Sequence, residues 1–161
     1  MPASCHMDEP TRPPHRCREK MASVIDARTE ALDARHFSTS EMRCSDGTPI
    51  LLAHRQLLRW LDYLRSWAGA QVQITSGYRT HAYNRRIGGA GESRHMYGLA
   101  ADVKVQGKTP SDVADWADRH GFGGVGRYES FTHLDVFGQD RRWDRTLVGC
   151  SRRETLSWTR P

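Results

Sequence analysis

The chain has 161 residues, about the length of one domain, and 37% of them are hydrophobic while 27% are charged. This composition allows one hydrophobic core and argues against an intrinsically disordered chain. The sequence contains no run of about 18 apolar residues, which excludes a membrane-spanning helix. The first twenty residues have no apolar segment, so we expect no ordinary secretory signal.

The balance of charge is basic, with 24 Lys and Arg against 19 Asp and Glu, for a net charge of +5. Nearly all of the basic residues are arginine. A basic chain favours anionic partners, such as nucleic acid, an acidic lipid surface or a bacterial wall. The alternative is a solvated surface that is merely rich in arginine. The four cysteines form no C-x-x-C pair, which argues against a zinc knuckle, and they leave open whether Cys44 pairs with Cys150.

The N-terminal half of the sequence predicts a tail followed by helices. Residues 1–17 have no periodicity and are expected to be flexible, whereas residues 18–34 show weak helical spacing. The segment 50–69 predicts a strong amphipathic helix that ends at Gly69 and packs on a sheet, with His54 near its start facing solvent. Its apolar stripe consists of Leu57, Leu58, Leu61, Leu64 and Trp67.

The C-terminal half alternates short strands with loops and one helix. Strands are predicted within 71–79, 99–105, 124–128 and 131–137, and the glycine-rich segment 81–93 is expected to be loop. Thr109 and Pro110 begin a helix that ends at Gly121. The fold class is therefore α+β, a small antiparallel sheet flanked by helices. We expect a basic tail over 1–35 with a possible short helix, one domain over 36–148, and a C-terminal tail over 149–161.

Two segments carry residues with metal-binding chemistry. In SRHMYGLAADVKV, a loop with His95 leads into a strand where Asp102 lies among small apolar residues. A buried carboxylate must be paired or bound to a metal, and an ion pair to an arginine is the simpler alternative. In FTHLDVF, strand alternation places His133 and Asp135 on one face, either as a metal edge or as a hydrogen-bonded pair. Together, His95, Asp102 and His133 offer three ligands and leave a fourth position for water, as in catalytic zinc sites.

These residues also resemble a known family. Ser93, His95, Gly98, Ala100 and Asp102 match the motif S-x-H-x-x-G-x-A-x-D. The segments HFSTSEMRCSDGTP, TSGYRT with YNRRIGGA, and GFGGVGRY with THLDV flank this motif in the order found in zinc D-alanyl-D-alanine carboxypeptidases and related endopeptidases. The resemblance covers about residues 36–143. The wider group includes lysostaphin-like peptidases and the Hedgehog signalling domain.

The resemblance implies a zinc peptidase that cuts peptidoglycan stem peptides, with one Zn²⁺ on the sheet face. It implies that His95, Asp102 and His133 are the ligands, that Arg79 binds a carboxylate or carbonyl of the substrate, and that Ser93 lines the pocket. The zinc would lower the pKa of bound water and polarise the scissile carbonyl.

The general base departs from the family pattern. Many relatives have an acidic residue three positions before the last zinc histidine, or a histidine two before it, and here these positions are Ser130 and Phe131. The remaining candidates are Asp135 and Glu129. Asp135 is favoured because it lies about 6.6 Å along the strand from His133, on the same face. Glu129 requires a bend at Ser130. Asp135 has a second possible role, which is to orient His133 or another ligand.

Three functional classes follow. The first is a zinc peptidase of the cell wall, acting as a carboxypeptidase or an endopeptidase. The second is a non-catalytic, zinc-containing module that binds the wall, since a standard base is missing. The third, a nucleic-acid binder that uses arginines such as Arg85 and Arg86, lacks any nucleic-acid-binding motif. We expect a monomer that neither binds nucleic acid nor inserts into a membrane, and that reaches the wall as a phage lysin or by another route of export.

Overall fold

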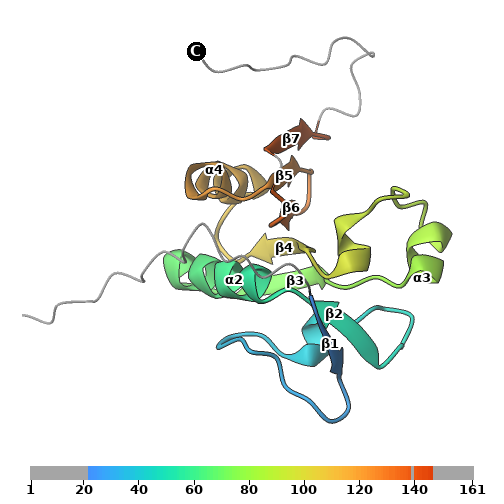
Figure 1. Ribbon diagram of the computed structural model, residues 1–161. Coiled ribbons are helices and arrows are strands. Elements are labelled where there is room, and N and C mark those ends of the chain that lie inside the picture. Colours follow the sequence, from blue (N-terminus) through green and yellow to red (C-terminus); the bar gives the residue numbers. More distant parts are fainter. Residues whose placement is uncertain (1–21, 139, 147–161) are drawn as a thin grey trace, which may run out of the picture.

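The computed structural model describes residues 22–138 and 140–146 (Figure 1). Its main sheet has five strands in the order β3–β4–β6–β5–β7, and all neighbours are antiparallel except β5 and β7, which are parallel. The strands are β3 (Val72–Ser76), β4 (Ala100–Val105), β5 (Gly124–Arg127), β6 (Thr132–Asp135) and β7 (Arg141–Asp144). The predicted α+β class is confirmed. The strand β7 was not predicted.

A second, two-stranded sheet is formed before the first long helix. It pairs β1 (Ser23–Asp26) with β2 (Ile50–Ala53) in antiparallel register, and a short helix, α1 (Thr39–Met42), lies between them in the chain. The helix predicted over 18–34 is wrong within the described residues 22–34, because β1 gains its backbone hydrogen bonds from β2, a distant partner that local spacing does not show. Ile25 and Leu32 join the core, although both precede residue 36.

The long helix α2 (Arg55–Ala68) confirms the helix predicted over 50–69 from residue 55 onward, but the prediction is wrong for residues 50–53, which form β2. The leucines of its stripe are buried, and Gly69 closes the helix in the left-handed conformation at φ 57°. The prediction that His54 faces solvent is wrong. This residue is buried as the N-cap, where its Nδ1 accepts a hydrogen bond from the backbone N–H of Gln56.

The remaining helical segments differ in how well the sequence predicted them. The helix α4 (Pro110–His120) is confirmed, with Thr109 and Asp112 forming a capping box and Gly121 in the left-handed conformation. The loop predicted over 81–93 is wrong in part, since it contains α3 (His81–Arg86), which Thr80 caps by accepting from the N–H of Tyr83. The glycines follow α3 and do not interrupt it. A 3₁₀ helix, η1 (Arg94–Tyr97), leads into β4.

The two faces of the main sheet have different roles. The helices α2 and α4 lie on one side, and α3 with the loop that carries η1 lies toward the other (Figure 1). On β4 and β6, Ala101, Val103 and Leu134 enter the core, so the alternate residues Asp102 and His133 lie on the opposite face. Among the described residues, no helix has the length and apolar character needed to cross a membrane.

Gly98 offers a test of how η1 is seated. It ends η1 at φ 66°, and a Cβ there would overlap the carbonyl oxygen of Leu52. Gly88 has nearly the same φ, 68°, but an added Cβ would meet no atom within 4 Å. Gly88→Ala therefore reports the backbone strain alone.

We expect Gly88→Ala to lower the free energy of unfolding by about 1–2 kcal/mol from backbone strain. Gly98→Ala should cost about 1–3 kcal/mol more, because overpacking adds to the same strain. Urea denaturation of the two variants measures both values. Equal losses would show that η1 is not held tightly against β2.

Candidate metal centre

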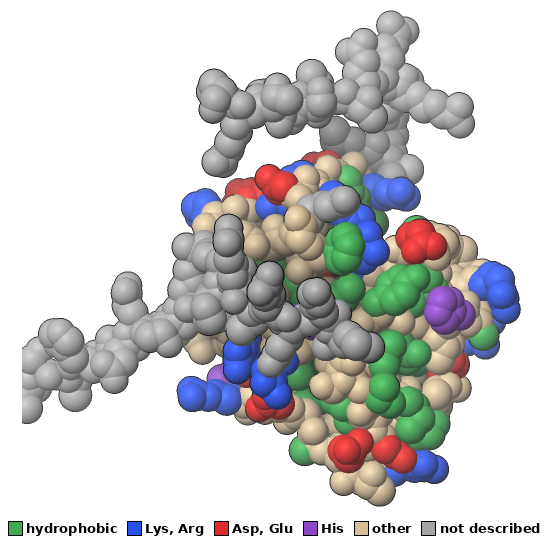
Figure 2. Space-filling view, viewed as in Figure 1, with side chains coloured by type: hydrophobic (Ala, Val, Ile, Leu, Met, Phe, Trp, Pro, Cys, Tyr) green, Lys and Arg blue, Asp and Glu red, His purple; other side chains and the backbone are tan. Residues whose placement is uncertain are grey.

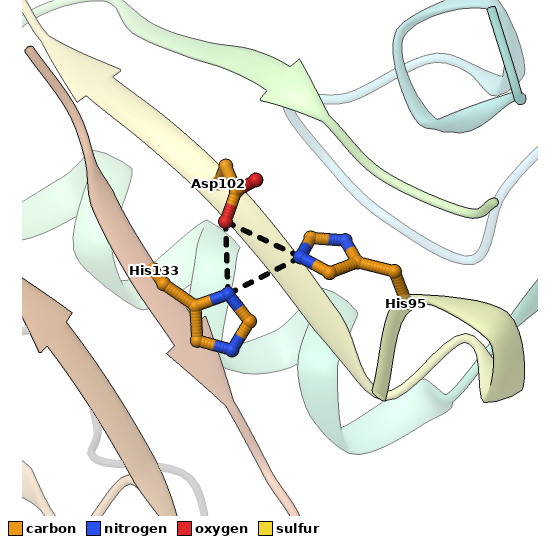
Figure 3. A group of neighbouring side chains, drawn as sticks. All are labelled: His95, Asp102 and His133. Carbon is orange, nitrogen blue, oxygen red and sulfur yellow. Dashed lines mark hydrogen bonds and ion pairs between the residues drawn. The ribbon is translucent and has the colours of Figure 1, made fainter. Parts of the chain in front are cut away.

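Three ligand-type side chains converge from three elements (Figure 3). Asp102 on β4 and His133 on β6 are direct cross-strand partners, so the sheet register alone brings them together. His95 comes from η1, and its ring reaches over β4 toward the same point. All three side chains are buried. The sequence predicted this group of residues, and the structure brings it together.

The distances between the ligand atoms fit a metal ion. The Nδ1 of His133 lies 2.8 Å from Oδ1 of Asp102, and Nε2 of His95 lies 3.2 Å from each of these atoms. Metal–ligand bonds of about 2.0–2.1 Å in a tetrahedral site place neighbouring ligand atoms about 3.3 Å apart. Within the described residues, this is the one group of His, Cys, Asp and Glu side chains with such geometry. The donor set of two imidazoles and one carboxylate suits zinc.

Both histidines are held in the orientation that a metal requires. The Nδ1 of His95 donates a hydrogen bond of 2.7 Å to the carbonyl oxygen of Gly77. The lone pair of Nε2 is therefore directed at the site. The Nε2 of His133 faces Oδ2 of Asp135 at 3.4 Å, while its Nδ1 faces the site. A metal-binding histidine commonly donates its other N–H to a carbonyl or carboxylate in this way.

Asp102 divides its two oxygens between different partners. Oδ1 faces the two histidines, whereas Oδ2 accepts a hydrogen bond of 2.6 Å from Nη2 of Arg79. Arg79 also donates from Nε to the hydroxyl of Ser76 at 2.8 Å. Its guanidinium therefore holds the carboxylate so that Oδ1 points at the site.

The surroundings of each group set its protonation state. Burial opposes ionisation of Asp102, but its close polar contacts with His133 and His95 outweigh burial and hold the pKa of Asp102 well below its usual range. Burial lowers the pKa of His95 in spite of its contact with Asp102. Burial also acts to lower the pKa of His133, yet hydrogen bonds to Asp102 and Asp135 raise it overall. An ionised Asp102 and a neutral His95 are the forms that bind metal.

The carboxylate of Asp135 does not face the point at which His95, Asp102 and His133 converge. Strand spacing predicts that the carboxylate of Asp135 meets a water on the metal. In the structure the carboxylate contacts Nε2 of His133, the ring nitrogen that points away from His95 and Asp102. Asp135 is fully buried and pairs with Arg141 at 2.7 Å. The contacts are those of a residue that orients His133.

The other two predicted site residues, Glu129 and Ser93, are not part of the buried group. Glu129 is exposed in the turn between β5 and β6, where residues 129 and 130 bend and Tyr128 stacks on Phe131 with ring centroids 4.3 Å apart. The chain at Glu129 is therefore not a regular strand. Ser93 is the residue that immediately precedes η1, and it is partly exposed.

The structure adds residues that the sequence analysis missed, and they come from β7. The ring centroid of Trp143 lies 5.0 Å from that of His133, and the Trp143 Nε1 donates a hydrogen bond of 3.1 Å to the hydroxyl of Tyr128. A Cβ on Gly126 would overlap the Trp143 ring, so this glycine makes room for the aromatic side chain. Trp143 is the one apolar residue within 141–144, so no apolar alternation there could have revealed β7.

A polar pocket of about 320 Å³ lies beside the end of β3, and none of His95, Asp102 and His133 lines it. Ser76 and Gly77 form part of its wall, and these residues accept hydrogen bonds from Arg79 and His95. The rest of the wall comes mainly from residues 40–47. Its volume is at the lower end of the range for ligand sites.

Comparison with known proteins agrees with this geometry. The model of the peptidase M15 family matches residues 18–135, which is most of the chain. A zinc D-Ala-D-Ala carboxypeptidase of Streptomyces albus G is 36% identical over 82 residues, which are 48% of this chain and 32% of that protein. The chain therefore matches about a third of the length of this relative.

The buried His–Asp–His group on the α+β sheet has the donor set and the spacing of a metal-binding site. By the extent of the family match, the chain belongs to the peptidase M15 family.

The geometry predicts that the protein binds one Zn²⁺ per chain. His133→Ala should lose most of the metal, because two ligands remain where three are needed. His95→Ala and Asp102→Ala should do the same. Metal content after dialysis is measured by atomic emission. His81→Ala, an exposed histidine on α3, is the control and should retain a full equivalent. A full equivalent in His133→Ala would remove His133 from the site.

Proposed function

We propose that this protein is a zinc-dependent peptidase that hydrolyses peptide bonds in peptidoglycan stem peptides, as a carboxypeptidase or endopeptidase of the D-Ala-D-Ala type. The observation that carries this proposal is the triangle of His95, Asp102 and His133, with its edges of 2.8–3.2 Å. Membership in the peptidase M15 family and the likeness to a zinc D-Ala-D-Ala carboxypeptidase support it.

In this proposal His95 binds zinc through Nε2, His133 through Nδ1 and Asp102 through Oδ1. Zinc supplies Lewis-acid chemistry when bound, polarising the scissile carbonyl and making water more acidic. The protein's own contribution is to fix the three donors. The Gly77 carbonyl and the Asp135 carboxylate each accept a hydrogen bond from the ring nitrogen that faces away from the site, on His95 and on His133 respectively.

Arg79 has two roles in the proposal. It keeps Oδ1 of Asp102 directed at the site, and it binds the carboxylate of the stem peptide. Its contacts with Asp102 and Ser76 use two of its five N–H donors, so others are available for substrate. The polar pocket lined by Ser76 and Gly77 is the proposed place for part of the peptide, and Ser93, two residues before His95, is proposed to contact the substrate.

We propose Glu129 as the general base, in place of the Asp135 that the strand spacing favoured. Asp135 faces the outer nitrogen of His133, so the width of an imidazole ring separates it from the reacting atoms. Glu129 is exposed, and the bend at residues 129–130 means that it is not held about 13 Å from His133, as four residues of regular strand would hold it. It would accept the proton of the attacking water and pass it to the leaving amine.

The proposed setting is a bacterial wall reached as a phage lysin. The net charge of +5 suits an anionic wall. Basic and acidic side chains alternate over the visible part of the face in Figure 2, without one large basic patch there. This distribution gives no support to nucleic-acid binding on that face.

Incubating the zinc-loaded protein with purified peptidoglycan tests the function. Mass analysis should detect either free D-alanine or shortened cross-links. These products tell a carboxypeptidase from an endopeptidase. Protein that has been treated with a chelator is the control and should release neither product. Zinc-loaded protein that binds the wall without releasing any product would instead be the non-catalytic module.

The choice of base is tested by two isosteric variants in the same assay. Glu129→Gln should retain zinc and lose about 10²–10⁴-fold in rate, which is typical for loss of a general base. Asp135→Asn should instead weaken zinc binding, by about 10–100-fold, because it loosens His133. A fully active Glu129→Gln, together with a zinc-replete but inactive Asp135→Asn, would return the role of base to Asp135.

The dual role of Arg79 predicts two separable losses. Arg79→Ala should bind zinc about 10-fold more weakly, because Asp102 loses its partner. At saturating zinc it should still cleave peptidoglycan at least 10-fold more slowly. Arg79→Lys should recover only part of the rate, since lysine lacks the bidentate fork. Arg85→Ala, an exposed arginine, controls for the loss of charge. A wild-type rate for Arg79→Ala at saturating zinc would show that Arg79 does not bind substrate.

A further inference from the structure

The strand β7 begins after the last residue of the family match, yet it reaches the metal centre. The family match ends at residue 135. The strand β7 pairs in parallel with β5, and the backbone N–H of Arg141 donates a hydrogen bond of 2.8 Å to the carbonyl of Gly123. This register places the guanidinium of Arg141 on Asp135, the residue behind His133.

The carboxylate of Asp135 is held from several directions. Oδ2 accepts a 2.7 Å hydrogen bond from Nη2 of Arg141 and lies 3.4 Å from Nε2 of His133. Oδ1 accepts a 3.0 Å hydrogen bond from the N–H of Phe137. No surface of Asp135 is exposed to solvent. A buried carboxylate needs such partners to remain ionised.

The strand β5 is shaped to admit this carboxylate. Gly124 lies opposite Asp135 in the register, and a Cβ on Gly124 would overlap Oδ2. A side chain there would therefore push the carboxylate away from His133. The space left by Gly124, which has no side chain, and the hydrogen bond from Arg141 therefore both determine where the carboxylate of Asp135 lies.

We propose that Arg141 is a positioning residue for the metal centre. It acts through Asp135 to hold Nδ1 of His133 toward Asp102 and His95. Oδ2 of Asp135 contacts both Nη2 of Arg141 and Nε2 of His133. The hydrogen bond from Arg141 therefore fixes the position of the oxygen that Nε2 of His133 faces. The inference rests on the proposed function only in taking His133 as a metal ligand.

A purely structural role and a purely electrostatic role give different expectations. If Arg141 only stabilised the fold, its loss would lower the melting temperature and leave metal affinity unchanged. If it acted only by its charge, removing a cation near the site would strengthen Zn²⁺ binding, because like charges repel. A positioning role predicts weaker binding, so the sign of the change separates the three.

The adjacent Arg142 provides a matched control on the same strand. It forms an ion pair with Asp118 of α4, and its Nη2 donates to the carbonyl of Phe122 at 3.1 Å. Strand alternation directs it away from the face that carries Arg141. Arg142→Met removes the same charge and a comparable set of contacts, without touching Asp135.

The experiment measures Zn²⁺ affinity of the full chain by competition with a chromophoric chelator. Arg141→Met should weaken zinc binding about 10-fold relative to the wild type, the lower end of the effect for groups that hold a ligand. Arg142→Met should keep the wild-type affinity, although its metal-free melting temperature falls. The visible absorption of the Co²⁺-loaded protein should change for Arg141→Met alone, reporting altered coordination.

Unchanged or tighter zinc binding in Arg141→Met would overturn the inference, as would equal weakening in Arg142→Met. If Arg141→Met does not fold, Arg141→Gln is judged by the same criteria. The proposed function fails separately, since it fails when the wild-type protein binds no zinc or cleaves no peptidoglycan.

Discussion

The buried, ionised carboxylate of Asp102 is the constraint on which the site depends. An isolated buried charge is costly, so each of its oxygens must be satisfied. Oδ1 meets the two histidines and Oδ2 meets Arg79, so one side chain ties together β4, β6, η1 and the turn after β3. Any rearrangement of these elements would leave that charge without a partner.

The register between β4 and β6 satisfies this constraint and builds the core at the same time. Asp102 faces His133, and the neighbouring pair, Ala101 and Leu134, lies in the core. A slip by one residue would exchange the two faces, burying the polar pair among the helices and exposing Leu134 at the site. The apolar residues that stabilise the sheet therefore also specify which ligand atoms meet.

Local sequence was sufficient where local physics decides the structure. The helix α4 could be predicted because Thr109, Pro110 and Gly121 act within their own turns. The placement of His95 before a strand that carries Asp102 could be predicted because Gly98 and the β-type residues after it indicate a loop followed by a strand. Local sequence was insufficient where a strand forms only by pairing with another strand that is distant in the sequence. The strand β1 depends on β2, and β7 depends on an edge of β5 that no pattern within residues 141–144 reveals.

The role of Asp135 shows the same limit at the level of one side chain. Strand alternation correctly places it on the face of His133, but alternation does not say which ring nitrogen it meets. That is decided by χ angles, by the room left at Gly124 and by a cation from β7. A base and an orienting residue are therefore indistinguishable by spacing.

The two histidines are oriented by different means, and the difference has consequences for the site. A backbone carbonyl, that of Gly77, holds His95, whereas His133 depends on a carboxylate that itself needs an arginine. Each carboxylate at the site has its own arginine, Arg79 for Asp102 and Arg141 for Asp135. These two pairs cancel in charge, so the metal position gains directed donors without a large excess of negative charge. Of the two histidines, His133 is therefore the one whose orienting partner a side-chain substitution can remove, because the partner of His95 is a backbone carbonyl.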